Sequence, residues 1–314
     1  MRPLSSAEIR GNWATLMLPI RSDESIDFES LAEQIDRLIE FRVDGIYSNG
    51  TAGEFFTQTE EEFIRVSELL AEKCEGAGMP FQLGASHMSP QTMLRRAEIA
   101  RRLCPSAIQV ILPDWFPLTN EEAADYLNRV AEVTQDVGLV LYNPPHAKRR
   151  LTSEDFLILL DRVPALVGMK VADGGAEWYQ GMRPVFSRAS VFIPGHHLAT
   201  GIREGARGAY SNVACLSPLH AQRWSDMTRR DLPRALELEA EIRAFWDGTL
   251  WPYINRLGYA NFAVDKFAAA IGGWTPITAR VRFPYKSIPQ RDAEELRERL
   301  PEFLSGFLAL EEEG

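Results

Sequence analysis

The stretch Leu166-Val167-Gly168-Met169-Lys170-Val171-Ala172-Asp173 has the form of a buried β-strand that carries a single lysine. It is short and mostly apolar, and the turn sequence Asp173-Gly174-Gly175 ends it. Alternation along a strand places Lys170 on one face with Gly168 and Ala172, and Val167, Met169 and Val171 on the other. The stretch therefore predicts a strand with one amine on its small-residue face, close to its carboxyl end.

Burial would change the chemistry of the Lys170 amine. A free lysine has a pKa of about 10.4 and is almost never buried without a reason. Burial disfavours the ammonium, lowers the pKa and leaves a nucleophilic amine that can attack a ketone. The alternative is a lysine on an edge strand that points at water, and the octapeptide alone does not separate the two.

Short apolar runs alternate with amphipathic helical patterns through most of the chain. Eight strands with a helical pattern after each predict a (β/α)8 TIM barrel, and a doubly wound open sheet is the competing fold. We expect the barrel over residues 1–229 and a C-terminal helical extension packed on it over residues 230–314. The predicted strands are Ala14–Ile20, Gly45–Asn49, Phe81–Ala85, Ala107–Leu112, Leu139–Tyr142, Val167–Ala172, Val191–Pro194 and Gly208–Ala214.

Helix starts are marked by hydroxyl side chains at capping positions. Thr59, Thr119 and Thr152 each precede a glutamate or aspartate by three positions, which is the spacing of a capping box. Ser89-Pro90 and Ser217-Pro218 place a hydroxyl before a first-turn proline. These signals predict where five of the helices begin.

Composition narrows the classes of function. The 314 residues include 34 Lys and Arg against 44 Asp and Glu, a net charge of −10, without a basic tail or stripe. Nucleic acid is therefore not an expected partner. The three cysteines form no CxxC pair, the first residues have no apolar signal-peptide core, and no run approaches the roughly 18 apolar residues of a membrane span. We expect a cytoplasmic protein with no membrane partner.

Reactive and polar residues follow the predicted strands, where TIM barrels carry their active sites. Tyr142 ends the fifth strand, and Gly50-Thr51-Ala52-Gly53-Glu54 follows the second with glycines and backbone N–H groups that could cradle a carboxylate. Taken alone, a tyrosine such as Tyr142 is more often a core aromatic, and a glycine-rich turn is most often only a turn. All five histidines also fall on this predicted rim: His87, His146, His196, His197 and His220.

A metal or nucleotide site is not expected. The sequence contains no GxGxxG, GxxxxGK[ST], GxSxG or HExxH motif. His196 and His197 are adjacent, so on extended backbone their side chains would point apart, and no carboxylate is tied to them by spacing. The sequence therefore predicts no metal.

Taken together, Gly50–Glu54, Tyr142-Asn143-Pro144-Pro145 and Gly168-Met169-Lys170 resemble motifs of the dihydrodipicolinate synthase / N-acetylneuraminate lyase family, class I pyruvate aldolases on a TIM barrel. The resemblance implies that Lys170 forms an imine with a 2-keto acid of the pyruvate type and that no other cofactor is needed. It implies that Tyr142 shuttles protons. It further implies a substrate pocket with Thr51 and the backbone of Ala52 at the keto-acid carboxylate, together with Gly195, His196, Tyr210 and Trp115.

The chain departs from dihydrodipicolinate synthases at three places. Ala52 replaces a second threonine, and Trp115 stands in the loop where those enzymes present a tyrosine from the adjacent subunit. Ala147 occupies the place of the arginine that binds the aldehyde's carboxyl group, which Lys148 or Arg149 could replace. These departures favour aldol cleavage, or dehydration, of a longer 2-keto acid over lysine biosynthesis.

Three hypotheses of function remain. The first is a Schiff-base lyase or aldolase that cleaves or forms a 2-keto-3-deoxy sugar acid. The second keeps the imine but is a dihydrodipicolinate synthase, which joins pyruvate to aspartate semialdehyde, or a keto-acid dehydratase. The third is a barrel without catalysis that binds a small acid, against which the intact Lys170 and Tyr142 argue. The resemblance also implies a homotetramer, built as a dimer of dimers, or a homodimer.

Overall fold

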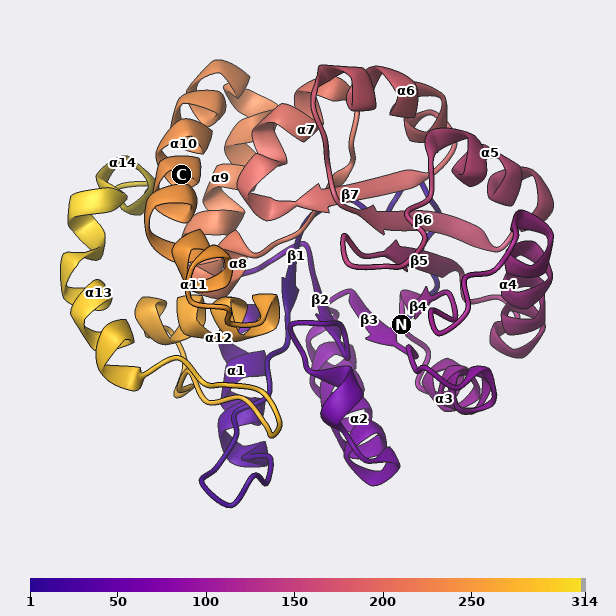
Figure 1. The fold of residues 1–314 in the computed structure, drawn as a ribbon, viewed down its shortest axis with the longest axis horizontal. Coiled ribbons are helices and arrows are strands. Elements are labelled where there is room, and N and C mark those ends of the chain that lie inside the picture. The colour runs from indigo at the N-terminus through magenta and orange to yellow at the C-terminus, as the bar shows by residue number, and fades with distance from the viewer. Residues whose placement is uncertain (312–314) are drawn as a thin grey trace.

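Eight parallel strands close into a barrel within residues 1–311, the part of the chain that this computed structural model describes (Figure 1). Each strand pairs with the next one in the chain, and β8 pairs with β1, which confirms the predicted TIM barrel. The strands are β1 (Gly11–Thr15), β2 (Gly45–Ser48), β3 (Phe81–Gly84), β4 (Ala107–Ile111), β5 (Leu139–Asn143), β6 (Leu166–Val171), β7 (Ser190–Pro194) and β8 (Gly208–Tyr210).

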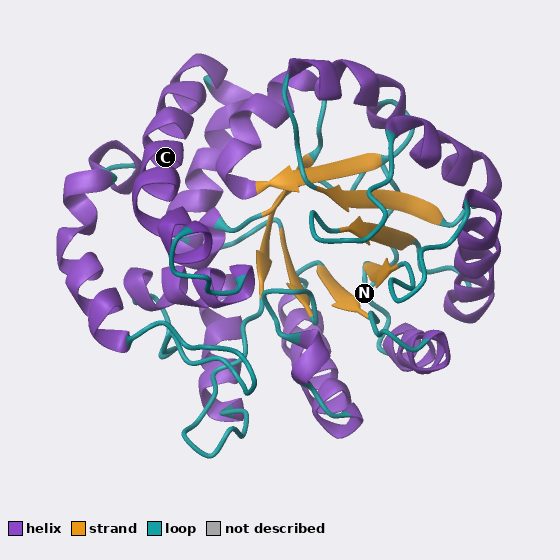
Figure 2. Cartoon of the chain, in the orientation of Figure 1, coloured by secondary structure: helices purple, strands orange, loops and turns teal. Residues whose placement is uncertain are grey.

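Helices surround the strands on the outside (Figure 2). The capping boxes predicted at Thr59, Thr119 and Thr152 are confirmed, and Ser89 accepts a hydrogen bond from the Thr92 N–H. Ser217 differs, because its hydroxyl bonds with His220 instead of capping the helix. The helices are α1 (Phe28–Glu40), α2 (Glu60–Ala77), α3 (Pro90–Arg102), α4 (Asn120–Thr134), α5 (Ser153–Arg162), α6 (Ala176–Phe186), α7 (Leu198–Glu204), α8 (Val213–Leu216) and α9 (Pro218–Arg230), with single turns η1 (Phe55–Thr57) and η2 (Gly195–His197).

A helical C-terminal region follows α9 and lies along one side of the barrel, drawn in orange and yellow in Figure 1. Helix α10 packs against α7 and α9, and α12 packs against α8 and α13. The division of the chain at residues 229 and 230 stays a prediction, and residues 312–314 of the predicted extension lie outside the described residues. This region comprises α10 (Leu232–Phe245), η3 (Trp246–Leu250), α11 (Trp251–Asn255), α12 (Asn261–Gly272), α13 (Gln290–Phe303) and α14 (Ser305–Leu308).

The first strand lies earlier in the chain than predicted, at Gly11–Thr15 instead of Ala14–Ile20. The apolar run continues past Thr15, but its backbone leaves the sheet. The Gln34 side chain bonds both the N–H and the carbonyl of Met17, at 2.7 and 3.1 Å, in place of a neighbouring strand. The buried Gln34 side chain thus bonds the Met17 backbone where a neighbouring strand would otherwise do so. The hydrophobic periodicity of the sequence could not reveal this substitution.

The last strand is shorter than predicted, since it ends at Tyr210 instead of Ala214. Ser211 turns the chain, and its hydroxyl accepts a hydrogen bond of 3.0 Å from the Ala214 N–H. The apolar residues that follow form α8, which packs between β1 and α12. A short apolar run fits a buried helix as well as a buried strand, and here tertiary packing selected the helix.

Strand β6 contains an irregularity that changes the predicted faces. Leu166 pairs with Leu139 and Gly168 with Val140, so Val167 has no partner on β5. Val167 packs with the residues inside the barrel, whereas Met169 and Val171 join the core between barrel and helices. Strict alternation was therefore wrong at Val167 but right for Lys170 relative to Met169 and Val171.

Candidate active site

Three phenol rings surround the Lys170 amine on strand β6. Tyr142 is the register partner of Lys170 on β5, and the lysine Nζ lies 4.4 Å from the centre of its ring. The Tyr47 hydroxyl on β2 is 3.4 Å from Nζ, and the Tyr210 ring centre on β8 is 5.3 Å away. Lys170 therefore points inward, into an aromatic enclosure, and the edge-strand alternative is excluded.

Burial lowers the pKa of Lys170 to about 8, while the nearby charge of Asp265 acts in the opposite direction. About a tenth of the amine is then uncharged at pH 7, against a negligible share for an ordinary lysine. An uncharged amine is the form that adds to a carbonyl carbon. The site thus keeps a usable nucleophile at neutral pH.

Tyr142 lies beside both Lys170 and the glycine-rich loop. It is buried and shares a hydrogen bond with the Thr51 side chain. Burial raises the pKa of Tyr142 to about 12, so the phenol keeps its proton at neutral pH. It can donate a hydrogen bond to an oxygen that gains negative charge beside the lysine.

Lys170 and Tyr142 open onto a cavity of about 230 Å³. Of the predicted site residues, Thr51, Ala52, His196 and Tyr210 also line it. Lys170 and Asp265 are the charged side chains of its wall among the residues described. The remaining lining residues are Tyr47, Pro145, Val171, Ala172, Ile193, Pro194, Ser211, Asn212, Cys215, Trp251 and Asn261.

The loop that carries Thr51 and Ala52 is held by a buried ion pair. Glu54 ends the loop in a left-handed conformation with φ of 50° and pairs with Lys266 of α12. Neither side chain of this pair is exposed to solvent. Lys266 also donates to the Arg280 carbonyl at 2.9 Å, and the Arg282 N–H donates to Glu54 at 3.2 Å. The C-terminal region therefore fixes the conformation of the loop.

His196 is an uncharged hydrogen-bonding group on the cavity wall. Burial, followed by the charge of His197, lowers the pKa of His196 to about 4. Its ring nitrogen lies 3.0 Å from the Asn212 side-chain nitrogen, and its backbone N–H donates to the same side chain at 3.1 Å. Gly195 does not line the cavity itself, but a Cβ there would lie 2.5 Å from the Ser211 hydroxyl, so glycine permits this close approach.

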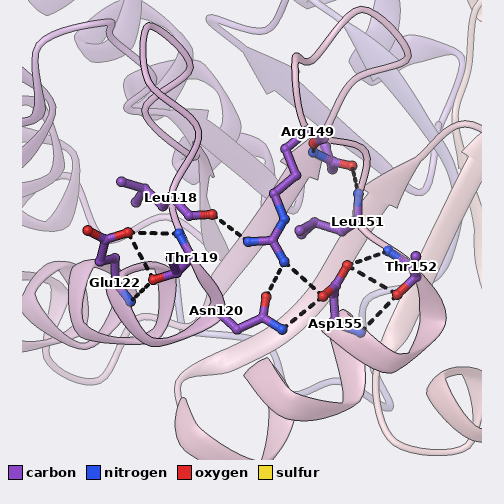
Figure 3. Close-up of polar contacts among 9 residues, drawn as sticks. Leu118, Thr119, Asn120, Glu122, Arg149, Leu151, Thr152 and Asp155 are labelled. Carbon is purple, nitrogen blue, oxygen red and sulfur yellow. Dashed lines mark hydrogen bonds and ion pairs between the residues drawn. The ribbon is translucent and has the colours of Figure 1, made fainter.

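Trp115 lies outside the cavity of its own chain. Its side chain is 73% exposed, and Lys148 covers it by donating to the Trp115 carbonyl and lying 4.8 Å from the ring centre. Arg149 is engaged elsewhere: it bonds to Leu118 and Asn120 and forms a 2.8 Å ion pair with Asp155 (Figure 3). Neither basic side chain reaches the cavity around Lys170.

The histidines are less clustered than the rim prediction implied. His196 lines the lysine cavity, while His146 lines a neighbouring cavity of about 440 Å³. His197 pairs with Asp173. His220 lies on the outer helix α9 and packs against Phe307 of α14, so its assignment to the substrate rim was wrong. The helix α8, not foreseen in the sequence, separates His220 from the end of β8.

Tyr47 and Asp265 are among the cavity residues that were not predicted from the sequence. Tyr47 stands only three positions before Gly50, near the carboxyl end of a predicted strand. That position could have indicated a residue of the active-site rim. Asp265 stands with Lys266 in the otherwise apolar run Phe262–Ile271 of α12. A pair of charges in an apolar helix is a recognisable sign of buried polar function.

Within residues 1–311, no cluster of three or more histidine, cysteine, aspartate or glutamate side chains is arranged to hold a metal ion. Over the same part of the chain, the helices lack the length and apolar character needed to cross a membrane.

The sequence profile described as the Dihydrodipicolinate synthetase family matches residues 8–301. The chain belongs to this family. The predicted resemblance is thereby confirmed, and the chain is a class I lyase, as members of this family are.

Curated relatives of the chain include two kinds of enzyme. The 4-hydroxy-tetrahydrodipicolinate synthases of Ehrlichia canis and Thermomicrobium roseum are 24% and 28% identical, over 76% and 74% of this chain and 81% and 78% of theirs. An N-acetylneuraminate lyase of Citrobacter koseri is 25% identical over 53% of this chain and 56% of its own length. At these identities the relatives do not distinguish one substrate from another.

Solved structures share the fold over nearly the whole chain. The Escherichia coli K12 protein YagE, of the dihydrodipicolinic acid synthase family and solved in complex with pyruvate, has a TM-score of 0.82 at 19% identity and covers 94% of this chain and 98% of its own. The N-acetylneuraminate lyase of Fusobacterium nucleatum has a TM-score of 0.80 at 20% identity, with 95% and 99% covered. These similarities establish the barrel and its helical C-terminal region.

Proposed function

We propose that this enzyme cleaves or forms a 2-keto-3-deoxy sugar acid through an imine between Lys170 and the keto carbon, with pyruvate and a hydroxylated aldehyde on the other side of the reaction. The observation that carries the proposal is the half-buried Lys170 amine, whose pKa is lowered to about 8, at the wall of a cavity beside Tyr142. The imine nitrogen, once protonated, draws electrons from the neighbouring carbon–carbon bond and lets it break or form. No cofactor besides this imine is required.

The other predicted residues take roles around the imine in this proposal. Thr51 and the Ala52 backbone bind the keto-acid carboxylate, and Tyr142 donates a hydrogen bond to the reacting oxygen. Tyr210 lines the pocket, and Gly195 positions His196, whose ring contacts a substrate hydroxyl. Trp115 takes part only if it reaches the site of another subunit.

The charge of the cavity favours a sugar acid over aspartate semialdehyde. A sugar acid presents hydroxyl groups beyond the keto-acid end, whereas aspartate semialdehyde brings a second carboxylate. The cavity wall also holds His196, Asn212, Asn261 and Asp265, and no arginine or second lysine lines the cavity among the described residues. A second carboxylate would there meet the Asp265 charge without a cation to pair with. Dihydrodipicolinate synthesis and keto-acid dehydration remain the alternative candidates.

Borohydride reduction in the presence of pyruvate tests the imine. We expect the intact chain to gain the mass of one reduced pyruvate adduct at Lys170, and Lys170→Ala to gain none and to lose all turnover while keeping its fold. Lys286→Ala, which removes an exposed lysine, serves as the matched control and should label normally. An unmodified wild-type chain, or a Lys170→Ala variant with full activity, would rule out the imine mechanism.

Substrate panels test the finer proposal. Pyruvate release from 2-keto-3-deoxy sugar acids should exceed any consumption of pyruvate with aspartate semialdehyde. Turnover of aspartate semialdehyde alone would instead assign the enzyme to dihydrodipicolinate synthesis.

A further inference from the structure

The Asp265 carboxylate lies in the lysine cavity without a hydrogen-bond partner. Helix α12 presents Asn261 and Asp265, four positions apart on one face, to the cavity, whereas Lys266 turns to Glu54. No hydrogen bond to Asp265 is formed by any group of residues 1–311, and its charge acts on Lys170, Tyr47, Tyr142 and Cys215. A half-buried carboxylate that faces these groups and has no hydrogen-bond partner of its own is available to a ligand.

Burial raises the pKa of Asp265 to about 7, although the Lys170 charge works against this rise. At neutral pH the carboxyl group is therefore divided between its acid and its base form. A proton-transfer group works best when its pKa lies near the working pH. Tyr142, with a pKa raised to about 12, is a phenolate in only about one molecule in 10⁵ at pH 7. Of these two side chains, Asp265 is the stronger candidate for a base.

We propose that Asp265 is a catalytic acid–base residue that takes the proton from the substrate hydroxyl on the carbon at the aldehyde end of the breaking bond. This inference rests on the proposed function. The hydroxyl O–H electrons form the carbonyl of the departing aldehyde, and the carbon–carbon bond breaks. Its electron pair moves through the imine carbon to the protonated nitrogen and leaves a neutral enamine of pyruvate on Lys170. Protonated Asp265 returns the proton to the enamine carbon, and water then hydrolyses the imine.

The position of Asp265 fits this step. The keto-acid end of the substrate is anchored at Lys170 on β6 and at the Thr51 loop after β2, so the rest of the substrate extends into the remaining space of the cavity. Asn212, His196, Asn261 and Asp265 line that space, and Asp265 is its one carboxylate among the described residues. An uncharged, hydroxylated aldehyde can donate a hydrogen bond to Asp265, and an anionic one cannot approach it without repulsion.

Asp265→Asn separates this role from the imine. The amide matches the shape of a protonated carboxyl group but cannot take a proton. We expect the variant to trap pyruvate with borohydride as fully as the wild type, while release of pyruvate from a 2-keto-3-deoxy-4-hydroxy acid falls by roughly 10²-fold or more. Asp265→Glu should recover part of the loss, and Asp247→Asn, which changes an exposed carboxylate of the same region, should leave the rate unchanged.

A pH measurement distinguishes catalysis from a purely electrostatic effect on the lysine. Loss of the Asp265 charge removes an interaction that favours the Lys170 ammonium, so pyruvate trapping in Asp265→Asn should reach its plateau at a lower pH. A variant with wild-type cleavage, or one whose trapping falls as much as its cleavage, would overturn the proposal. A wild-type enzyme that traps no pyruvate would instead overturn the imine mechanism itself.

Discussion

At the scale of single residues, the charge on Lys170 would control imine formation, the first step of the proposed reaction. Its pKa is lowered to about 8, so the amine is mostly protonated below that pH and mostly free above it. We predict that the rate constant for pyruvate imine formation rises with pH and levels off above about pH 8. Rapid borohydride quenching over a pH series measures this rate. A rate still rising near pH 10 would show that the amine has the pKa of a solvent-exposed lysine.

The side chains around Lys170 explain why its pKa is lowered although no second lysine lines the same cavity among the described residues. Tyr47, Tyr142 and Tyr210 replace water around Nζ, and below them Trp13 and Phe192 fill the barrel interior. The Trp13 ring meets Phe192 and Tyr210 edge-on, at 6.5 and 6.1 Å between centres. This aromatic floor closes the barrel beneath the amine, so substrate can reach it only from the carboxyl ends of the strands.

At the scale of elements, helix α12 connects the C-terminal region to the chemistry. Its Asp265 enters the cavity, and the next residue, Lys266, holds Glu54 of the loop that carries Thr51 and Ala52. Arg282, beyond the helix, bonds Glu62 at 2.5 Å and the Thr57 carbonyl at 3.0 Å, which secures the start of α2 beside the same loop. The C-terminal region thus forms part of the cavity wall and holds the loop beside it.

Lys266→Met should destabilise the fold strongly. It leaves the Glu54 carboxylate buried without its cation, and breaking a buried pair by removing one partner costs roughly 3–5 kcal/mol. We predict a fall of that order in the free energy of unfolding measured with urea, with a lower affinity for pyruvate because the loop loses its support.

The double variant Glu54→Leu/Lys266→Met is the matched control, because it removes both charges together. Its unfolding free energy should fall by less than the sum of the two single variants. Additive losses would show that Glu54 and Lys266 do not act as a pair.

At the scale of the whole molecule, an exposed aromatic surface predicts self-association. Trp115, Phe116 and Phe283 are 73, 78 and 78% exposed, and the segments that carry them flank the second cavity. A cluster of large apolar side chains on a surface usually marks a contact with another protein. We predict that Trp115→Ser with Phe116→Ser shifts the chain to smaller species in sedimentation velocity. A wild-type chain that sediments as a monomer would contradict both this surface and the homotetramer or homodimer expected from the family.

Local patterns in the sequence were sufficient for the barrel and for the centre of its site. Alternating strand and helix patterns and hydroxyl caps are properties of neighbouring residues, so they could be read directly. Closure of the barrel then brings the carboxyl ends of all strands together, which is why Lys170, Tyr142 and Thr51 could be assigned to one place from their positions alone.

Only the tertiary structure decided the features that depend on distant partners. Gln34 takes the backbone of Met17 out of the sheet, and Lys266 meets Glu54 across 212 positions of sequence. Asp155 holds Arg149 away from the cavity, and Asp265 enters it from the C-terminal region. A charged side chain's role depends on which groups surround it after folding, and no local pattern of residues specifies those groups.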